Sequence, residues 1–229
     1  MKTGILGGTF NPPHFGHLRL AEEVAGSYDL DRIIFVPCHQ PPHKDKTDIP
    51  DAQDRLNMTV LACADNPKFE VSDVELKFPP PSYTINTLKY FKAIPQNDIY
   101  FIMGSDSLAE IGAWKDCENL FSLANFIIVR RPGASFDQAW KRIPGSLRAK
   151  FSLNQGEFFH TSGTTMISSG VKGLDISSTE IRRLIKHLLS ARYLTPDSVI
   201  DYIKKHDLYC TTANRQKTTY GKTRNEINY

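Results

Sequence analysis

Long apolar runs are missing from this sequence of 229 residues. Its longest runs, such as Ile33–Val36 and Phe126–Val129, are far shorter than the roughly 20 residues that a membrane-spanning helix needs. The first residues, Met1–Gly4, hold one charge and no long apolar stretch. We therefore expect no signal peptide, no membrane partner and a cytoplasmic location.

Cysteines are few and widely spaced. The four are Cys38, Cys63, Cys117 and Cys210, and none forms a C-x-x-C pair. This spacing argues against a disulfide framework and against a thiolate zinc site. We expect free, buried thiols in a reducing compartment.

The body of the chain also lacks an excess of charge of either sign. Residues 211–229 carry the whole formal net charge of +3, so the preceding 210 residues are neutral overall. Because nucleic-acid-binding domains are typically basic, we expect no nucleic-acid partner. The basic tail is polar and poor in apolar residues, which predicts disorder there.

Apolar patterning predicts a β-α-β unit at the start of the chain. Lys2–Leu6 is a short apolar run that stops at two glycines, as a strand does when it enters a tight turn. Apolar residues then recur at helical spacing over Leu18–Ala25. Ile33–Val36 predicts a second, buried strand.

The alternation continues to about residue 130. We expect helices at Asp51–Ala64 and Thr84–Phe91, and strands at Phe69–Leu76, Ile99–Met103 and Phe126–Val129. In the helix expected at Asp51–Ala64, the buried side should consist of Leu56, Val60, Leu61 and Ala64. Apolar strands that alternate with helices predict an α/β fold, with a Rossmann-like doubly wound parallel sheet covered on both faces.

The last third of the chain has a different pattern. A short strand is expected at Phe158–Thr161, followed by helices at Ser178–Leu189 and Pro196–His206. We therefore predict a Rossmann-like domain over residues 1–175, a small helical C-terminal subdomain over 176–210 and a tail over 211–229. No internal repeat is present, and no oligomeric state is predicted.

Four unusual segments directly follow expected strands. They are Gly7–His17, Pro37–Lys44, Gly104–Asp106 and Arg130–Gly133. Ligands of doubly wound sheets bind at the carboxyl ends of the strands. The four segments should therefore meet in one crevice.

The first of these segments predicts an anion site. Gly7 and Gly8 allow the backbone to approach a ligand closely, and the free N–H groups at the start of the helix near Gly16 attract anions. The glycine spacing fits neither the G-x-G-x-x-G fingerprint nor the Walker loop. His14 and His17 can both donate to a phosphate oxygen, and as imidazolium they can offset developing charge.

Other interpretations of these histidines are open. Histidine near a helix start is often a capping or surface residue, and His14, His17, His39 and His43 could together form a metal site. No carboxylate or thiolate nearby completes such a set, and the surrounding prolines and glycines suit a backbone cradle better.

Two segments far apart resemble one superfamily fingerprint. GGTFNPPHFGH at 7–17 resembles the (H/T)xGH motif of the nucleotidyltransferases, and ISSTEIR at 176–182 resembles their ISSTxIR motif. The resemblance implies a Rossmann-like fold and the transfer of AMP or CMP from a nucleoside triphosphate.

Four further stretches resemble the bacterial nicotinate-nucleotide adenylyltransferase family. They are Val36–Pro37 with Pro41–Lys44, Ser82–Ile85 with Thr87–Leu88, Gly104–Leu108 with Trp114, and Tyr193–Leu194 with Val199–Leu208. The match covers residues 1 to about 210. Two departures are Asn86, where the family usually has Asp, and Cys38–Gln40 in the loop before Pro41.

This resemblance implies a reaction and its partners. ATP and nicotinate mononucleotide give nicotinate adenine dinucleotide and pyrophosphate, and Mg²⁺ is expected with ATP. The implied catalytic residues are His17, His14, Lys44 and Arg182. The implied ATP-binding residues are Gly7, Gly8, Thr9, Phe10, His14, His17, Gly104, Asp106, Ile176, Ser177, Ser178, Thr179 and Arg182. The implied residues for the mononucleotide are Lys44, Tyr83, Thr84, Asp106, Trp114 and Arg131. No metal-ligating side chain is implied.

Simpler roles compete with several of these. Ser177 and Glu180 also fit an ordinary capping box at a helix start. Trp114 could instead be a core residue, and Lys44 could be a solvated loop residue. The same chemistry could act on nicotinamide mononucleotide or phosphopantetheine, and the same fold could serve a catalytically silent nucleotide sensor.

Overall fold

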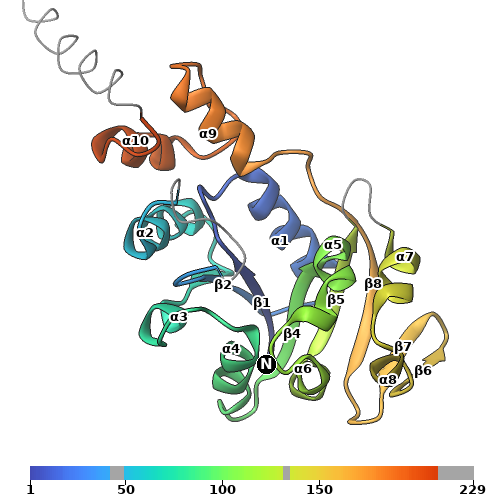
Figure 1. The fold of residues 1–229 in the computed structure, drawn as a ribbon. Helices are drawn as coiled ribbons and strands as arrows, with labels where there is room; N and C mark the ends of the chain where they lie inside the picture. Colours follow the sequence, from blue (N-terminus) through green and yellow to red (C-terminus); the bar gives the residue numbers. More distant parts are fainter. Residues whose placement is uncertain (42–48, 131–134, 211–229) are drawn as a thin grey trace, which may run out of the picture.

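A central sheet of eight strands organises the molecule (Figure 1). The computed structural model describes residues 1–41, 49–130 and 135–210. The strands are β1 Lys2–Gly8, β2 Arg32–Pro37, β3 Phe69–Val71, β4 Asp98–Gly104, β5 Asn125–Arg130, β6 Phe151–Asn154, β7 Glu157–His160 and β8 Thr165–Lys172. Their spatial order is β3-β2-β1-β4-β5-β8-β7-β6.

Helices cover both faces of this sheet. The α-helices of the described residues are α1 Phe15–Ser27, α2 Ala52–Cys63, α3 Val74–Lys77, α4 Thr84–Lys92, α5 Ser105–Ala109, α6 Cys117–Leu123, α7 Phe136–Arg142, α8 Gly145–Arg148, α9 Ser178–Lys186 and α10 Asp197–Lys205, of which α9 and α10 lie beyond the edge of the sheet (Figure 1). Side chains alternate across β2, so that Ile33 packs in the cluster beneath α1 whereas Ile34 packs in the cluster that holds α4 to α7. This two-sided burial explains why the strands are continuous apolar runs.

The parallel part of the sheet has the predicted doubly wound topology. β1 pairs in parallel with both β2 and β4, and the chain continues outward on each side. The strand order therefore reverses between β1 and β4. At such a point the connections leave in opposite directions and open a crevice at the carboxyl ends of the strands.

Beyond β5 the sheet holds strands that the sequence did not predict. β8 pairs in parallel with β5, and β7 and β6 then add an antiparallel hairpin. Only β7 corresponds to an expected strand, Phe158–Thr161. The sequence of β8, TMISSGVK, is too polar to read as a buried strand.

The strand expected over Phe69–Leu76 was wrong in its second half. β3 ends at Val71, and α3 forms a single helical turn from Val74. Between them the Ser72 hydroxyl accepts a hydrogen bond from the Val74 N–H at 3.3 Å. Serine and aspartate form such local turns readily, and one helical turn is too short to show its own period.

The buried face predicted for α2 was wrong at two of its four residues, because Leu56 and Leu61 are half-buried but Val60 and Ala64 are not. Val60 is 49% exposed and Ala64 lies exposed after the helix, whereas Arg55 and Thr59 are buried. The Thr59 hydroxyl donates to the Arg55 carbonyl at 2.7 Å. Polar side chains can be buried where the fold satisfies their hydrogen bonds, and apolar periodicity cannot detect this.

The two C-terminal helices were predicted correctly, with ends at Lys186 and Lys205. α10 packs on α2, where Val199 and Ile203 meet Met58 and Ala62 (Figure 1). The division at residue 175 stays a prediction, and the basic tail lies outside the described residues.

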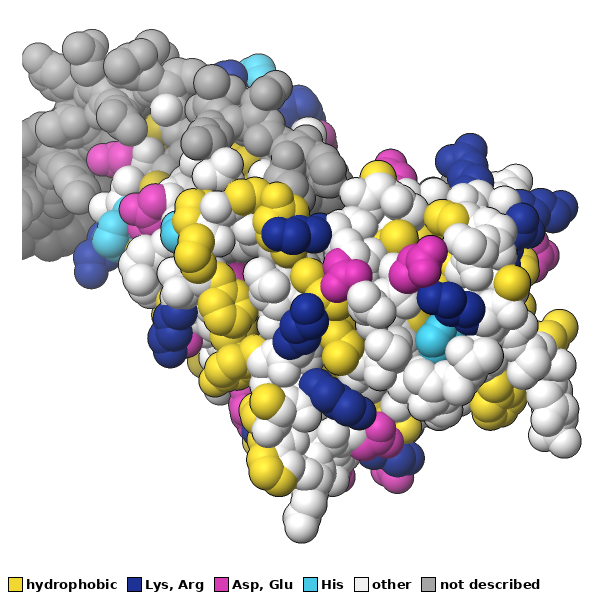
Figure 2. Space-filling model, turned by 60° about the horizontal axis from the view of Figure 1, so that its bottom comes forward, with side chains coloured by type: hydrophobic (Ala, Val, Ile, Leu, Met, Phe, Trp, Pro, Cys, Tyr) yellow, Lys and Arg dark blue, Asp and Glu magenta, His cyan; other side chains and the backbone are white. Residues whose placement is uncertain are grey.

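Charged side chains of both signs are interspersed on the face that Figure 2 shows. Among the described residues, no helix is both long enough and apolar enough to cross a membrane. Cys38, Cys63 and Cys117 are free thiols. Of the four cysteines only Cys63 is fully buried, so the expected burial holds for one of the four.

Candidate active site

The turn between β1 and α1 is built over the ring of Phe10. This residue has a φ of 46°, in the left-handed region, and its side chain is 2% exposed. A Cβ at Gly8 would lie 3.0 Å from the Phe10 ring, which explains the glycine there. Because the ring is buried, Phe10 can face a ligand only with its backbone, next to Gly7, Gly8 and Thr9.

His14 and His17 form one unit at the start of α1. Their rings are stacked with centroids 3.7 Å apart, and His14 is 3% exposed. The His14 backbone N–H donates to Nδ1 of His17 at 3.2 Å. Because Nδ1 accepts, the neutral His17 ring carries its proton on Nε2. His17 therefore offers an N–H donor on the side away from its own backbone contact.

Gly16 leaves room for this histidine pair. A Cβ at Gly16 would lie 2.9 Å from Nδ1 of His14, whereas a Cβ at Gly26, on the same helix, would meet nothing within 4 Å. We expect Gly16→Ala to displace the His14 ring and lower turnover about tenfold, since small misplacements cost large factors in rate. Gly26→Ala should leave turnover unchanged and stabilise α1 by about 0.5–1 kcal/mol. Steady-state rates and thermal melting of both variants test this, and equal rates would contradict it.

The segment 176–182 lies against the segment 7–17. The Ser178 hydroxyl donates to the Pro12 carbonyl at 2.8 Å, and Nη1 of Arg182 donates to the Asn11 carbonyl at 2.9 Å. The α9 start and the β1–α1 turn are thus joined across 166 and 171 positions of sequence. Figure 1 shows α9 beside the N-terminal end of α1. Two helix N-termini therefore lie next to each other at this edge of the sheet.

In the segment Ile176–Arg182, one of the two hydrogen bonds of the alternative capping box is present. Ser177 is the N-cap of α9 and accepts from the Glu180 N–H at 3.2 Å. The Glu180 carboxylate instead pairs with Arg183 at 2.7 Å. Ile176 is half-buried, and Thr179 receives a weak bond from Nη2 of Arg182 at 3.4 Å.

Two of the residues expected around the acceptor lie at the start of α4. Tyr83 is the N-cap of this helix, and Thr84 is its first residue. The ammonium of Lys115 lies 4.3 Å from the centre of the Tyr83 ring. Trp114 precedes Lys115, is half-buried and packs against the same apolar cluster as Tyr83. Trp114 is thus partly a core residue, and Lys115 is a neighbour that the sequence motifs did not indicate.

Gly104 and Asp106 lie at the end of the neighbouring strand. Gly104 ends β4 and precedes α5, and Asp106 is exposed in the first turn of α5. β4 pairs directly with β1, so both residues belong to the edge where the strand order reverses. Lys44 and Arg131 lie outside the described residues, as does His43.

The sequence analysis missed one buried polar residue, Arg55, and one half-buried polar residue, Tyr209. Arg55, 1% exposed, donates to the Thr9 carbonyl at 2.9 Å and to the His39 carbonyl at 2.7 Å. The Tyr209 hydroxyl donates to Oδ1 of Asn11 at 2.7 Å, and burial raises its pKa. Both brace the turn that holds the histidines, and neither belongs to a local sequence motif.

Nearby acidic and thiol groups are shifted toward their neutral forms. Burial raises the pKa of the Cys38 thiol and that of the Glu75 carboxyl, whose Oε1 accepts from the Thr87 hydroxyl at 2.5 Å. A protonated thiol is a poor nucleophile, so Cys38 does not suit covalent catalysis. Within the described ranges, no group of three or more His, Cys, Asp or Glu side chains could hold a metal ion. His39 donates from Nδ1 to the Phe78 carbonyl at 3.1 Å.

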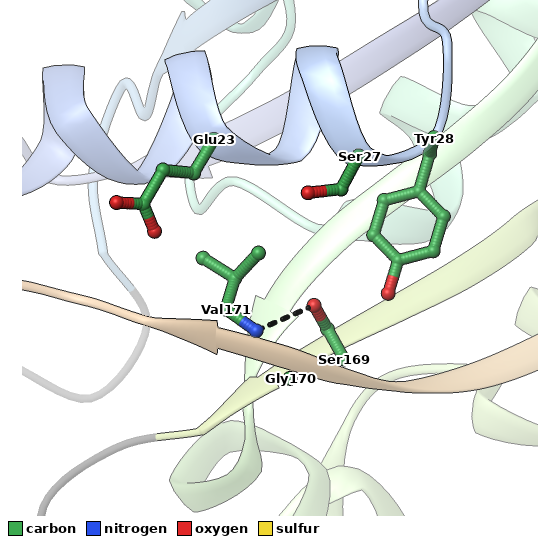
Figure 3. A pocket seen from close by; sticks show the side chains of 6 residues that line it. All are labelled: Glu23, Ser27, Tyr28, Ser169, Gly170 and Val171. Atoms are coloured by element: carbon green, nitrogen blue, oxygen red, sulfur yellow. Dashed lines mark hydrogen bonds between the residues drawn. The ribbon is translucent and has the colours of Figure 1, made fainter.

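A separate hollow of about 460 Å³ lies between the end of α1 and β8 (Figure 3). Its lining residues are Glu23, Ser27, Tyr28, Ser169, Gly170 and Val171. The Ser169 hydroxyl accepts from the Val171 N–H at 3.1 Å. No residue predicted for the active site lines this hollow, and its one charged group is a carboxylate, which does not suit a phosphate.

Comparisons with known proteins point to one family. A sequence model described as cytidylyltransferase-like matches residues 5–184. A relative from Geotalea daltonii, named "Probable nicotinate-nucleotide adenylyltransferase", is 44% identical over 212 residues, which are 91% of this chain and 98% of the relative. A relative of the same name from Syntrophotalea carbinolica is 44% identical over 91% of this chain and 97% of its own length. The solved Plasmodium falciparum nicotinic acid mononucleotide adenylyltransferase, complexed with NaAD, has the same fold, with a TM-score of 0.69 at 22% identity over 91% of this chain and 97% of that one.

Proposed function

The chain belongs to the nicotinate-nucleotide adenylyltransferases of the cytidylyltransferase-like family, and from this premise we propose that it transfers AMP from ATP to nicotinate mononucleotide. The products are nicotinate adenine dinucleotide and pyrophosphate, as the NAD biosynthesis of this family requires. One observation of the structure supports the assignment most strongly. The histidine-bearing start of α1 and the start of α9 are hydrogen-bonded to each other at the edge where the strand order reverses.

This arrangement suits a triphosphate. Backbone N–H groups at the two helix starts, the Nε2–H of His17 and the guanidinium of Arg182 are all donors, and none needs a covalent role. The phosphate oxygen of the mononucleotide attacks the α-phosphorus of ATP while the bond from that phosphorus to the bridging oxygen breaks. Pyrophosphate leaves with the bonding electrons, so the protein must hold the reactants in line and offset the charge.

We assign the donor roles accordingly. His17 stabilises the α-phosphate in the transition state, and His14 supports it from the stacked position. Gly7, Gly8, Thr9 and Phe10 contribute backbone contacts along the phosphates. Arg182, with Ile176–Thr179 at the start of α9, holds the β- and γ-phosphates. Gly104 and Asp106 lie at the end of the adjacent strand, where Asp106 can hold a ribose hydroxyl.

The acceptor roles belong to the other side of the crevice. Backbone N–H groups at Tyr83 and Thr84 bind the nicotinate carboxylate, and Trp114 stacks on the nicotinate ring. Lys44 and Arg131 are proposed as phosphate and charge partners from the family motifs, and both lie outside the described residues. The ammonium of Lys115, held over Tyr83, adds positive charge next to the carboxylate.

Mg²⁺ accompanies ATP in this proposal. Among the residues that the structure describes, no cluster of ligating side chains could hold the ion alone, so phosphate oxygens and water would be its main ligands. The ion would neutralise phosphate charge when bound. A cytoplasmic location belongs to the same proposal, and the free thiols of Cys38, Cys63 and Cys117 support a reducing compartment.

A panel of acceptors tests the function. Pyrophosphate release is measured with ATP and either nicotinate mononucleotide, nicotinamide mononucleotide or phosphopantetheine. We expect kcat/KM to be at least about tenfold higher for nicotinate mononucleotide than for its amide, because backbone donors and Lys115 favour a carboxylate over a neutral group. An equal or higher value with the amide would contradict the substrate assignment.

A further inference from the structure

Arg55 joins three backbone segments near the carboxyl ends of β1 and β2. From its position on α2 it donates to the carbonyls of Thr9 after β1, His39 after β2 and Pro50 before α2, at 2.9, 2.7 and 3.2 Å. The guanidinium is planar and presents its donors in a fixed fork. It therefore fixes the relative positions of these segments more tightly than single hydrogen bonds would.

The charge of Arg55 has no ion-pair partner within the described part of the chain. Burying a charge is unfavourable unless hydrogen bonds replace the water that it loses. Here backbone carbonyls do so, and the guanidinium also contacts the Cys38 sulfur at 3.6 Å. An apolar residue at this place would avoid the desolvation of a charge. The arrangement thus points to a role beyond packing α2.

A second set of hydrogen bonds connects the loop that holds His39 to Ser82, just before α4. The His39 N–H donates to the Ser82 hydroxyl at 2.8 Å, and the Ser82 N–H donates to the Gln40 carbonyl at 3.0 Å. Ser82 directly precedes Tyr83, the N-cap of α4. Hydrogen bonds therefore connect Thr9, through Arg55 and His39, to Ser82, and the peptide bond after Ser82 leads to the start of α4.

We propose that Arg55 is a positioning residue that sets the donor turn at Thr9 and the acceptor-binding start of α4 in register with each other. This inference rests on the proposed function, in which the two ends of the path bind the two substrates. In-line attack requires the mononucleotide oxygen to face the α-phosphorus within a narrow range of distance and angle. Each substrate contacts only its own end of this hydrogen-bonded path. Loosening the path at Arg55 would therefore leave the affinity for each substrate unchanged, but it would impair the alignment of the two substrates with each other.

The test separates kcat from KM. Arg55→Lys keeps the charge but loses the planar fork, Arg55→Met removes the charge and keeps an apolar stem, and Ser82→Ala removes the hydroxyl from the second set of hydrogen bonds. We expect each folded variant to lower kcat about tenfold or more, while the KM values for ATP and nicotinate mononucleotide change less than about threefold. Circular dichroism and thermal melting establish which variants are folded.

Arg19→Met provides the matched control. Arg19 lies on α1, its side chain is 54% exposed, and its ion pair with Glu23 is on the surface, so kcat should stay at the wild-type value. If Arg55→Met does not fold, Arg55→Lys and Ser82→Ala still decide the question. An unchanged kcat in both, or a rise in only one KM with kcat retained, would overturn the inference.

Wild-type activity distinguishes this inference from the proposed function. Wild-type protein that releases no pyrophosphate from ATP and nicotinate mononucleotide would overturn both. Active wild-type protein with unaffected Arg55 and Ser82 variants would overturn only the role of Arg55.

Discussion

Replacing His17 by alanine should lower kcat about a hundredfold or more while the protein stays folded. The Nε2–H of His17 is aimed away from the His14 backbone contact, and its loss removes a donor to charge that develops on the α-phosphate. The fold should persist because His17 is only half-buried and alanine is a better helix former. Pyrophosphate release at saturating substrates measures the effect.

His187→Ala is the matched control for this prediction. His187 is an exposed histidine at the C-cap of α9, and its Nδ1 bonds only to the Arg183 carbonyl of its own helix, at 2.8 Å, among the contacts the structure gives for it. Its replacement should leave kcat unchanged. Near-normal turnover of His17→Ala, with circular dichroism like that of the wild type, would refute the assigned role.

Arg182→Ala should lower kcat/KM for ATP by about 10- to 100-fold, the range expected for a lost charge-assisted hydrogen bond to phosphate. The variant also loses the bond to the Asn11 carbonyl that ties α9 to the histidine turn. Arg182→Lys keeps the charge but loses the fork, so it should recover only part of the activity. Initial rates at varied ATP concentration, with nicotinate mononucleotide held saturating, measure both variants.

The neighbouring arginine supplies the control. Arg183 is exposed and pairs with Glu180 on the surface of the same helix, at 2.7 Å. Because exposed ion pairs contribute about 0–1 kcal/mol, Arg183→Ala should change neither kcat nor KM. Equal losses in the two variants would mean that both act through the stability of α9, and would contradict a phosphate contact by Arg182.

Local patterns predicted the parallel half of the fold well. β1, α1 and β2 follow from apolar periodicity and from the two glycines at the end of the first strand, because these signals act over a few neighbouring residues. The same patterns failed at β8, whose polar sequence is held in the sheet by pairing with β5. They failed again at α2, where hydrogen bonds from distant parts of the chain allow Arg55 to be buried.

The candidate site divides in the same way. Both motifs were visible in the sequence because each is a contiguous stretch with an unusual residue order. The contacts between them were not visible, since Arg182 meets Asn11 across 171 positions and Tyr209 meets Asn11 across 198. Lys115 reaches the Tyr83 ring in a similar way, through space and without a motif.

The sequence by itself determined the doubly wound arrangement, the histidine pair and the chemistry that suits a triphosphate, because glycine turns, helix starts and apolar runs are local properties of the chain. Only the tertiary structure decided which tautomer His17 holds, which face of α2 is buried, and that Arg55 joins the Thr9 and His39 carbonyls. Those features depend on hydrogen bonds between segments that the fold alone brings together, and such bonds leave no period or motif in the sequence.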